Sequence, residues 1–112
     1  MSSRPPFRCE THSDRGQAQV RPVGELDIAT VPEVDQRLRE LRQAGHDRLV
    51  LDLRATTFMD SSGLRLILTW HDEAARDGVT FGLIAGEEVV QRVFDTTRVR
   101  ELLTFVEPAP GA

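Results

Sequence analysis

The chain has no lysine and no tyrosine, and it carries one cysteine among its 112 residues. Because Cys9 stands alone, it cannot form an intramolecular disulfide, and one small thiol in an extended segment is typical of a half-buried apolar position. All 14 basic residues are arginine, which we attribute to codon use in a GC-rich genome. These absences exclude an internal disulfide framework and agree with a reducing cytosol.

A long hydrophobic run is also missing. No apolar stretch approaches the roughly 18 to 20 residues that a membrane span requires, and residues 1–6 lack the apolar core of a signal peptide. The net charge of -4 and the sequence pI of about 5.3 oppose the basic face that a nucleic-acid-binding protein presents. We therefore expect a cytoplasmic protein that binds neither a membrane nor nucleic acid.

The composition that is present fits one globular domain. Hydrophobic residues make up 39% and charged residues 29%, which leaves enough apolar surface to pack a sheet against helices. One hydrophobic core typically serves about 100 to 150 residues, so we expect a single domain over residues 1–112. Its core is predicted over about residues 7–106, with a flexible tail at residues 107–112.

The first half of the chain is predicted to form a hairpin followed by a helix. Residues 7–12 and 17–23 have strand patterns and are joined by the turn-forming residues 13–16. Thr30 and Glu33 have the spacing of a capping box, which predicts that a helix begins there. The apolar residues that follow at helical spacing are Val31, Val34, Leu38 and Leu41, and Gly45 is placed to end the helix in a left-handed turn.

The second half alternates strands and helices. Residues 49–53 are almost continuously apolar, which predicts a central strand covered on both faces of a parallel or mixed sheet. The later elements are predicted as a helix from Gly63 to Gly78, a strand at 79–85, a short helix from Glu87 through Phe94, a last turn within 99–103 and an edge strand at 105–106. The fold class is therefore α/β, a four- or five-stranded mixed β-sheet with helices packed mainly on one face.

The segment from Asp60 to Gly63 lies between an apolar strand region and an amphipathic helix. Asp and Ser accept hydrogen bonds from the free amides of a first helical turn, so an N-cap is its structural interpretation, but three such residues exceed what one cap requires. A phosphate on Ser61 would add roughly -1.5 to -2 charge where the helix dipole tolerates an anion. It would also repel a partner that fits a neutral hydroxyl beside Asp60.

Three short segments carry a family resemblance. The chain has GELD at residues 24–27, LVLDL at residues 49–53 and FMDSSGL at residues 58–64. In this order and at these separations, the segments resemble those of the STAS-domain anti-sigma factor antagonists of bacteria. The match runs from about Val20 to Phe105.

The resemblance implies a partner-switching cycle. The unphosphorylated protein would bind an anti-sigma factor that is also its serine kinase and so release the sigma factor, and phosphorylation would end that binding. Ser61 matches the family's phosphoacceptor, Ser62 matches a neighbour that shapes the site, and Asp27 matches an acidic residue close to the phosphoacceptor. The residues that the resemblance assigns to the partner surface are Asp27, Asp60, Ser61, Ser62 and Gly63.

The resemblance also implies what surrounds this cycle. A separate metal-dependent serine phosphatase would restore the unphosphorylated form. The chain itself would not be an enzyme, would bind no cofactor or metal, and would be a monomer when free.

Three observations qualify the match. Asp27 also has a structural interpretation, as a turn or capping residue beside Thr30. At Arg98 family members commonly have glycine, so we expect the end of the third helix to be built differently or to carry a different partner contact. The family usually adds a final amphipathic helix, which the sequence up to Ala112 does not provide, so we expect a short or missing last layer.

Two other roles of the same domain compete with the switch. A STAS subunit of a lipid or anion transport assembly would be a structural module without a phosphoserine, and the serines of the DSSG turn favour the switch over it. A scaffold component of a stress-sensing complex would usually carry a sensory domain, for which 112 residues leave no room.

Hydrolytic and metal chemistry are disfavoured by residue spacing. A nucleophilic serine would need His12, His46 or His71 as its base, yet no Gly-x-Ser-x-Gly elbow is present. A metal site would draw on Cys9 and the three histidines, whose spacings are unrelated. Trp70 is either a partner anchor or, as is more usual for a lone tryptophan, partly buried packing.

Overall fold

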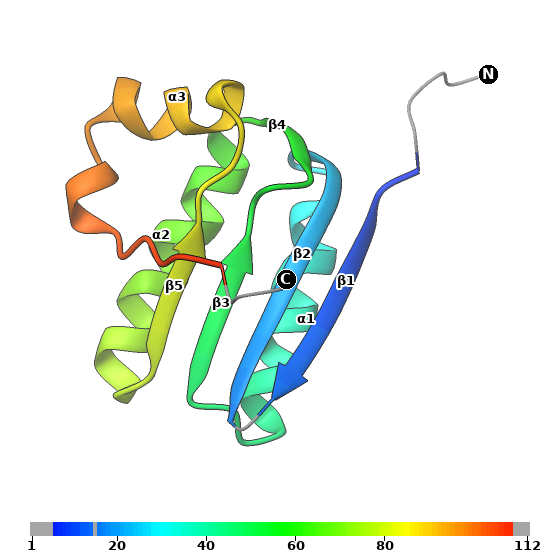
Figure 1. Cartoon of the computed structure of the whole chain (residues 1–112), viewed down its shortest axis with the longest axis vertical. Coiled ribbons are helices and arrows are strands. Elements are labelled where there is room, and N and C mark those ends of the chain that lie inside the picture. Colours follow the sequence, from blue (N-terminus) through cyan, green and yellow to red (C-terminus); the bar gives the residue numbers. More distant parts are fainter. Residues whose placement is uncertain (1–5, 15, 109–112) are drawn as a thin grey trace.

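The computed structural model describes residues 6–14 and 16–108 (Figure 1). The strands are β1 (Arg8–Asp14), β2 (Gln17–Leu26), β3 (Arg48–Asp52), β4 (Thr56–Met59) and β5 (Thr80–Ile84). The helices are α1 (Val31–Gln43), α2 (Ser61–Asp77) and α3 (Glu88–Thr97), followed by the 3-10 turn η1 (Arg100–Leu102). This five-stranded mixed sheet with helices confirms the predicted fold class, and the tail predicted at 107–112 lies, from residue 109 on, outside the described residues.

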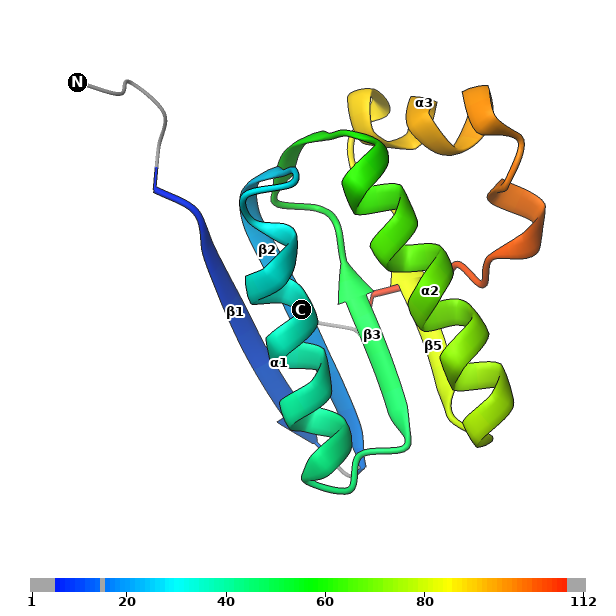
Figure 2. The ribbon, with the colours of Figure 1, turned by 180° about the vertical axis from the view of Figure 1, so that it is seen from behind.

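The sheet runs in the order β1-β2-β3-β5, with β1 antiparallel to β2 and the other neighbours parallel. Helices α1 and α2 cover one face, as Figures 1 and 2 show from the two sides. Strand β4 was not predicted as a separate strand. It pairs in parallel with the last residues of β2, after a register shift between Gly24 and Glu25, so β2 contacts β3 first and β4 later. None of the helices in the described part of the chain has the length and apolar character that crossing a membrane needs.

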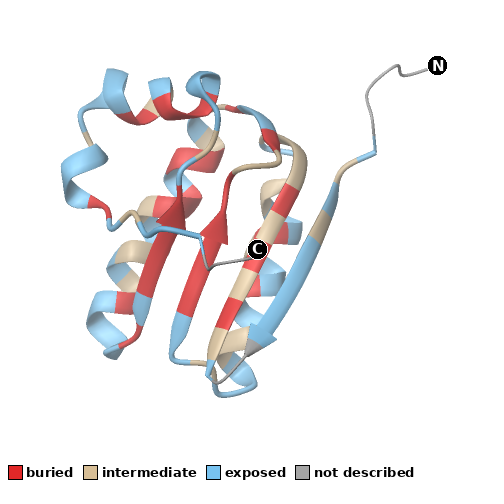
Figure 3. Cartoon of the chain, in the orientation of Figure 1, coloured by how far each residue is buried: buried red, intermediate tan, exposed pale blue. Residues whose placement is uncertain are grey.

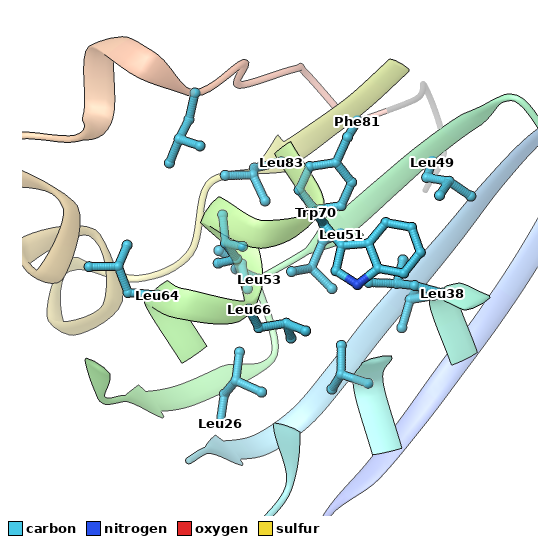
Figure 4. Packing of buried hydrophobic residues seen from close by; sticks show 14 of the residues in the cluster. Leu26, Leu38, Leu49, Leu51, Leu53, Leu64, Leu66, Trp70, Phe81 and Leu83 are labelled. Atoms are coloured by element: carbon cyan, nitrogen blue, oxygen red, sulfur yellow. The ribbon is translucent and has the colours of Figure 1, made fainter. Parts of the chain in front are cut away.

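The core lies between the sheet and the two long helices (Figure 4). Trp70 belongs to this core, because only 3% of its surface is exposed and its ring lies 6.3 Å from that of Phe81. Its indole N–H donates to Asp35 of α1 at 2.9 Å, and the Arg39 guanidinium stands 5.1 Å from the centre of its ring. The packing interpretation of Trp70 is therefore confirmed, and the side chain joins α2 to α1.

The opposite face of the sheet carries a buried ion-pair cluster. Asp52 is fully buried and accepts hydrogen bonds at 2.8 Å from the guanidinium groups of Arg21 and Arg54. Burial raises the pKa of Asp52, but the hydrogen bonds from Arg54 and Arg21 outweigh it and hold that pKa below its ordinary value. Val50, on the same face, is 7% exposed, so the central strand is buried on both faces, as predicted.

Glycines follow α1 and α2, whereas an arginine follows α3. Gly45 and Gly78 have φ values of 99° and 70° next to the ends of α1 and α2, as predicted. Arg98 caps α3 at φ 60° and is the only non-glycine residue with positive φ in the described chain. Glycine adopts this conformation freely, whereas it costs an L-residue roughly 1 kcal/mol or more. The different helix end that we expected at Arg98 is therefore one in which a non-glycine residue is under backbone strain.

The chain after α3 is shorter in regular structure than predicted. The turn expected within residues 99–103 is η1. The edge strand expected at 105–106 is reduced to a single parallel bridge between Phe105 and Leu83. Leu83 N–H donates to Thr104 and Leu83 C=O accepts from Val106, so this segment lies against the outer edge of β5.

Candidate functional site

Two strand-to-helix turns lie side by side at one end of the sheet. Strands β2 and β4 are parallel neighbours, with Leu26 opposite Met59, and Asp60 N–H donates to the Leu26 carbonyl at 3.3 Å. The turn from β2 into α1 and the turn from β4 into α2 therefore emerge together (Figure 1). We call the residues that these turns present, together with one neighbour in β4, the Ser61 surface: Asp27, Ile28, Phe58, Asp60, Ser61 and Ser62.

Asp60 caps α2. Its backbone is extended, and its Oδ1 accepts hydrogen bonds from Ser62 N–H at 2.8 Å and Gly63 N–H at 3.4 Å. Ser61 is the first residue of the helix and is exposed, and within the described residues its side chain makes no hydrogen bond or ion pair. The cap interpretation of this segment thus applies to Asp60, and the Ser61 hydroxyl is not used by the fold.

Gly63 brings the first turn of α2 close to the sheet. It is buried, and a Cβ at this position would lie 2.6 Å from Met59 Cγ and 3.1 Å from Leu26 Cγ. A side chain would therefore push the helix away from β2 and β4. Among the residues assigned to the partner surface, Gly63 fixes where Ser61 stands.

Asp27 forms a similar turn at the start of α1. Its Oδ1 accepts hydrogen bonds from Ala29 N–H at 3.0 Å and Thr30 N–H at 3.2 Å, and its carbonyl accepts from Val31 N–H at 2.9 Å. The turn interpretation of Asp27 is confirmed. Its contact with a partner stays a prediction.

The predicted capping box at Thr30 and Glu33 is wrong. Thr30 has helical backbone angles and makes no side-chain cap. Asp27 accepts from the Thr30 amide that Glu33 would hold in a capping box, and the Thr30 hydroxyl turns back and donates to the Glu25 carbonyl at 2.8 Å. The helix begins where predicted, but without a side-chain cap, and its first amide, that of Val31, donates to the Asp27 carbonyl.

Exposed apolar side chains flank these turns and were not identified from the sequence. Five large apolar residues are exposed in the described chain, and three of them are Ile28 at 78%, Phe58 at 42% and Val89 at 47%. Ile28 follows Asp27, Phe58 lies in β4, and Val89 lies in the first turn of α3, which packs against β4. An isoleucine inside a turn is the signal that the sequence offered.

The histidines lie away from Ser61. His71 is on the same helix, about 15 Å further along at about 1.5 Å per residue. His46 precedes β3 at the other end of the sheet, and His12 lies in β1. No group of three or more His, Cys, Asp or Glu side chains within the described residues could hold a metal ion. Cys9 is half-buried as predicted, and burial and the neighbouring Glu33 raise the pKa of its thiol to about 12.

Comparisons with known proteins agree on one family. A family model described as the STAS domain matches residues 9–108. An anti-sigma-B factor antagonist of Staphylococcus epidermidis is 31% identical over 93 residues, which cover 83% of this chain and 84% of the relative.

Two solved structures share the fold. The crystal structure of an anti-sigma factor antagonist from Mycobacterium paratuberculosis has a TM-score of 0.80 at 22% identity, covering 94% of this chain and 88% of that one. The Bacillus cell fate determinant SpoIIAA in its phosphorylated form has a TM-score of 0.69 at 21% identity, covering 94% of this chain and 93% of that one.

Proposed function

The chain belongs to the STAS domain family, and from that premise we propose that it is an anti-sigma factor antagonist controlled by phosphorylation of Ser61. The unphosphorylated Ser61 surface binds an anti-sigma factor that is also a serine kinase, which frees the sigma factor. Phosphorylation ends the binding. The observation that carries this proposal is the exposed Ser61 hydroxyl at the first position of α2. This hydroxyl is not needed for capping, because Asp60 caps the helix.

In the phosphoryl transfer, this chain contributes the Ser61 hydroxyl, and the kinase contributes the other reacting groups. The Ser61 Oγ attacks the γ-phosphorus of ATP held by the kinase, the bond to the bridging oxygen breaks, and ADP leaves. The hydroxyl proton passes to a base of the kinase. A phosphatase later hydrolyses the ester and releases inorganic phosphate. The chain supplies an exposed hydroxyl at a fixed place, which the cap at Asp60 and the close approach at Gly63 provide.

The surroundings of Ser61 favour a change in binding over a change in fold. A phosphate at the first residue of α2 lies at the positive end of the helix dipole, so the helix tolerates it. On the surface, the phosphate stands beside Asp60 and next to the turn that holds Asp27 and Ile28. A partner that covers Ile28 and Phe58 would have to desolvate this added charge, which lowers its affinity.

The relatives support the same proposal. The Staphylococcus epidermidis protein is named an antagonist of an anti-sigma factor, and SpoIIAA, which shares the fold, has a phosphorylated form. These names describe the relatives. They support the partner class of the proposal, and the exposed hydroxyl at the start of α2 supports the choice of Ser61.

The proposal is tested by phosphorylation of the purified chain. We expect incubation with ATP and candidate anti-sigma factor kinases to add one phosphate, located at Ser61 by peptide mass mapping. Ser61→Ala should abolish the label, and the matched neighbour Ser62→Ala should retain it. Absence of label with every kinase, or full labelling of Ser61→Ala, would overturn the switch and favour a transport or scaffold role.

A further inference from the structure

Among the residues that the structure describes, the outer edge of β1 is an unpaired strand edge. β1 is the first strand of the sheet and, within this part of the chain, pairs on one side only, with β2. Across residues 6–14 and 16–108, no other strand lies against its outer side. Figure 3 shows β1 largely exposed beside the buried centre of the sheet. Along these seven residues, the backbone groups on the outer side make a template that another strand can join.

The register with β2 determines which backbone groups point outward. Asp14 opposite Gln17 closes a two-residue hairpin and is therefore a hydrogen-bonded pair. Alternation from this pair directs the amides of Arg8, Glu10 and His12 toward β2. The amides and carbonyls that point to the free edge are those of Cys9, Thr11 and Ser13. Pro22, which has no N–H, lies opposite Cys9 at a position without hydrogen bonds, as this phase requires.

This edge is complementary to itself. If two β1 strands pair antiparallel about Thr11, the outward groups of Cys9 meet those of Ser13, and Thr11 meets its own copy. Glu10 then lies directly opposite His12 of the other copy, twice by symmetry. These are pairs without mutual backbone hydrogen bonds, in which side chains approach most closely. The imidazole N–H of His12 donates to a carboxylate in either protonation state.

The charges on β1 also favour antiparallel pairing with a second copy over protection of the edge from such pairing. Glu10 lies on the face without α1 and α2, where it pairs with Arg8 at 3.0 Å and Arg21 at 3.8 Å. Like charges that lie directly opposite each other destabilise a strand pair. Here a carboxylate and an imidazole flank Thr11 symmetrically, so antiparallel pairing brings unlike groups together.

We propose that the outer edge of β1 binds a second copy of this chain and joins two sheets into one continuous sheet. The twofold axis passes beside Thr11, perpendicular to the sheet, so the two Ser61 surfaces lie at opposite ends and stay open. The contact is one strand pair, smaller than the about 1,200 Å² of a stable interface, so the dimer forms at high concentration. This dimer differs from the monomer that the family resemblance implies only at high concentration, and it does not depend on phosphorylation.

Sedimentation velocity on the full chain between about 10 µM and about 1 mM tests the contact. We expect the mass to rise from 12.6 kDa toward twice that value. Thr11→Pro removes an outward N–H and leaves the β2 ladder intact, so dimerisation should weaken at least about tenfold. Thr11→Val keeps the N–H and should dimerise as the wild type does. A wild-type chain that stays monomeric throughout, or a folded Thr11→Pro variant that dimerises equally well, would overturn the proposal.

A charge exchange tests the register and serves if Thr11→Pro does not fold. His12→Glu places carboxylates opposite each other and should weaken the dimer at least about tenfold. The double variant Glu10→His with His12→Glu restores unlike pairs in the same register and should recover much of the loss. Equal dimerisation of His12→Glu and wild type would contradict pairing about Thr11.

Discussion

The turns at Asp27 and at Asp60 both use an aspartate to bind free backbone amides between a strand and a helix. In both, an aspartate at the end of a strand accepts two backbone hydrogen bonds, which come from the first turn of α2 for Asp60 and from Ala29 and Thr30, before α1 begins, for Asp27. Asp60 does so directly before its helix, and Asp27 does so through an intervening turn of three residues. The two turns differ in the next residue, which is Ile28 after Asp27 and Ser61 after Asp60.

This difference distinguishes the residues that stabilise the two turns from the residues that are exposed for binding. The aspartates satisfy the free amides of the two turns, Asp60 those of the first turn of α2 and Asp27 those of Ala29 and Thr30, so neither the Ile28 nor the Ser61 side chain is needed there. One turn therefore presents an apolar tip that is 78% exposed, and the other presents a hydroxyl. We interpret the first as partner contact and the second as the position at which that contact is switched.

The largest effect is expected when charge is placed on the hydroxyl turn. Ser61→Glu should lower affinity for the anti-sigma factor at least about 100-fold, or about 2.7 kcal/mol, because the partner must desolvate an anion. Calorimetric titration measures this. Thr69→Glu adds the same charge at a position further along α2 and should bind normally. Equal losses in the two variants would show an effect of net charge alone.

The second largest effect is expected at Gly63, which allows the first turn of α2 to lie close to the sheet. Gly63→Ala places a methyl group 2.6 Å from Met59 Cγ and should destabilise the fold by about 2 kcal/mol. Urea unfolding monitored by circular dichroism gives the value. Ser62→Ala, its half-buried neighbour, should change stability much less. If Gly63→Ala were neutral, the two turns would not be held as closely as described.

The apolar tip is expected to act on binding alone. Ile28→Ser should weaken anti-sigma factor binding about tenfold, or about 1.4 kcal/mol, since it removes exposed apolar contact area. Its thermal stability should match the wild type. Leu102→Ser is the matched control, because Leu102 is 63% exposed in η1 and outside the Ser61 surface. Normal binding by Ile28→Ser would assign the first turn a purely structural role.

The smallest effects should be alike in the two turns. Asp27→Ala and Asp60→Ala each remove the acceptor of two backbone amides and should cost about 1 kcal/mol of folding stability. Serine at either position keeps an acceptor and should recover part of the loss. Chemical unfolding of the four variants provides the comparison. A loss confined to one aspartate would break the parallel between the turns.

The sequence predicted the long helices and the central strand because their apolar residues repeat over many positions. Strand β4 has only four residues, and its two central ones are exposed, so no strand period was visible. The capping box was predicted wrongly, because Asp27 accepts from the Thr30 amide that Glu33 would hold, and the Thr30 hydroxyl donates to the Glu25 carbonyl. Both contacts depend on the folded turn and are not visible in the residue spacing. Ile28 was missed because an apolar residue is expected to be buried.

The most direct test is a titration of the anti-sigma factor with the chain in its two chemical states. The account predicts that the unphosphorylated protein binds and that the protein phosphorylated at Ser61 binds at least about 100-fold more weakly, while both have the same fold by circular dichroism. Equal affinity of the two folded states would contradict the claim that Ser61 is the switch.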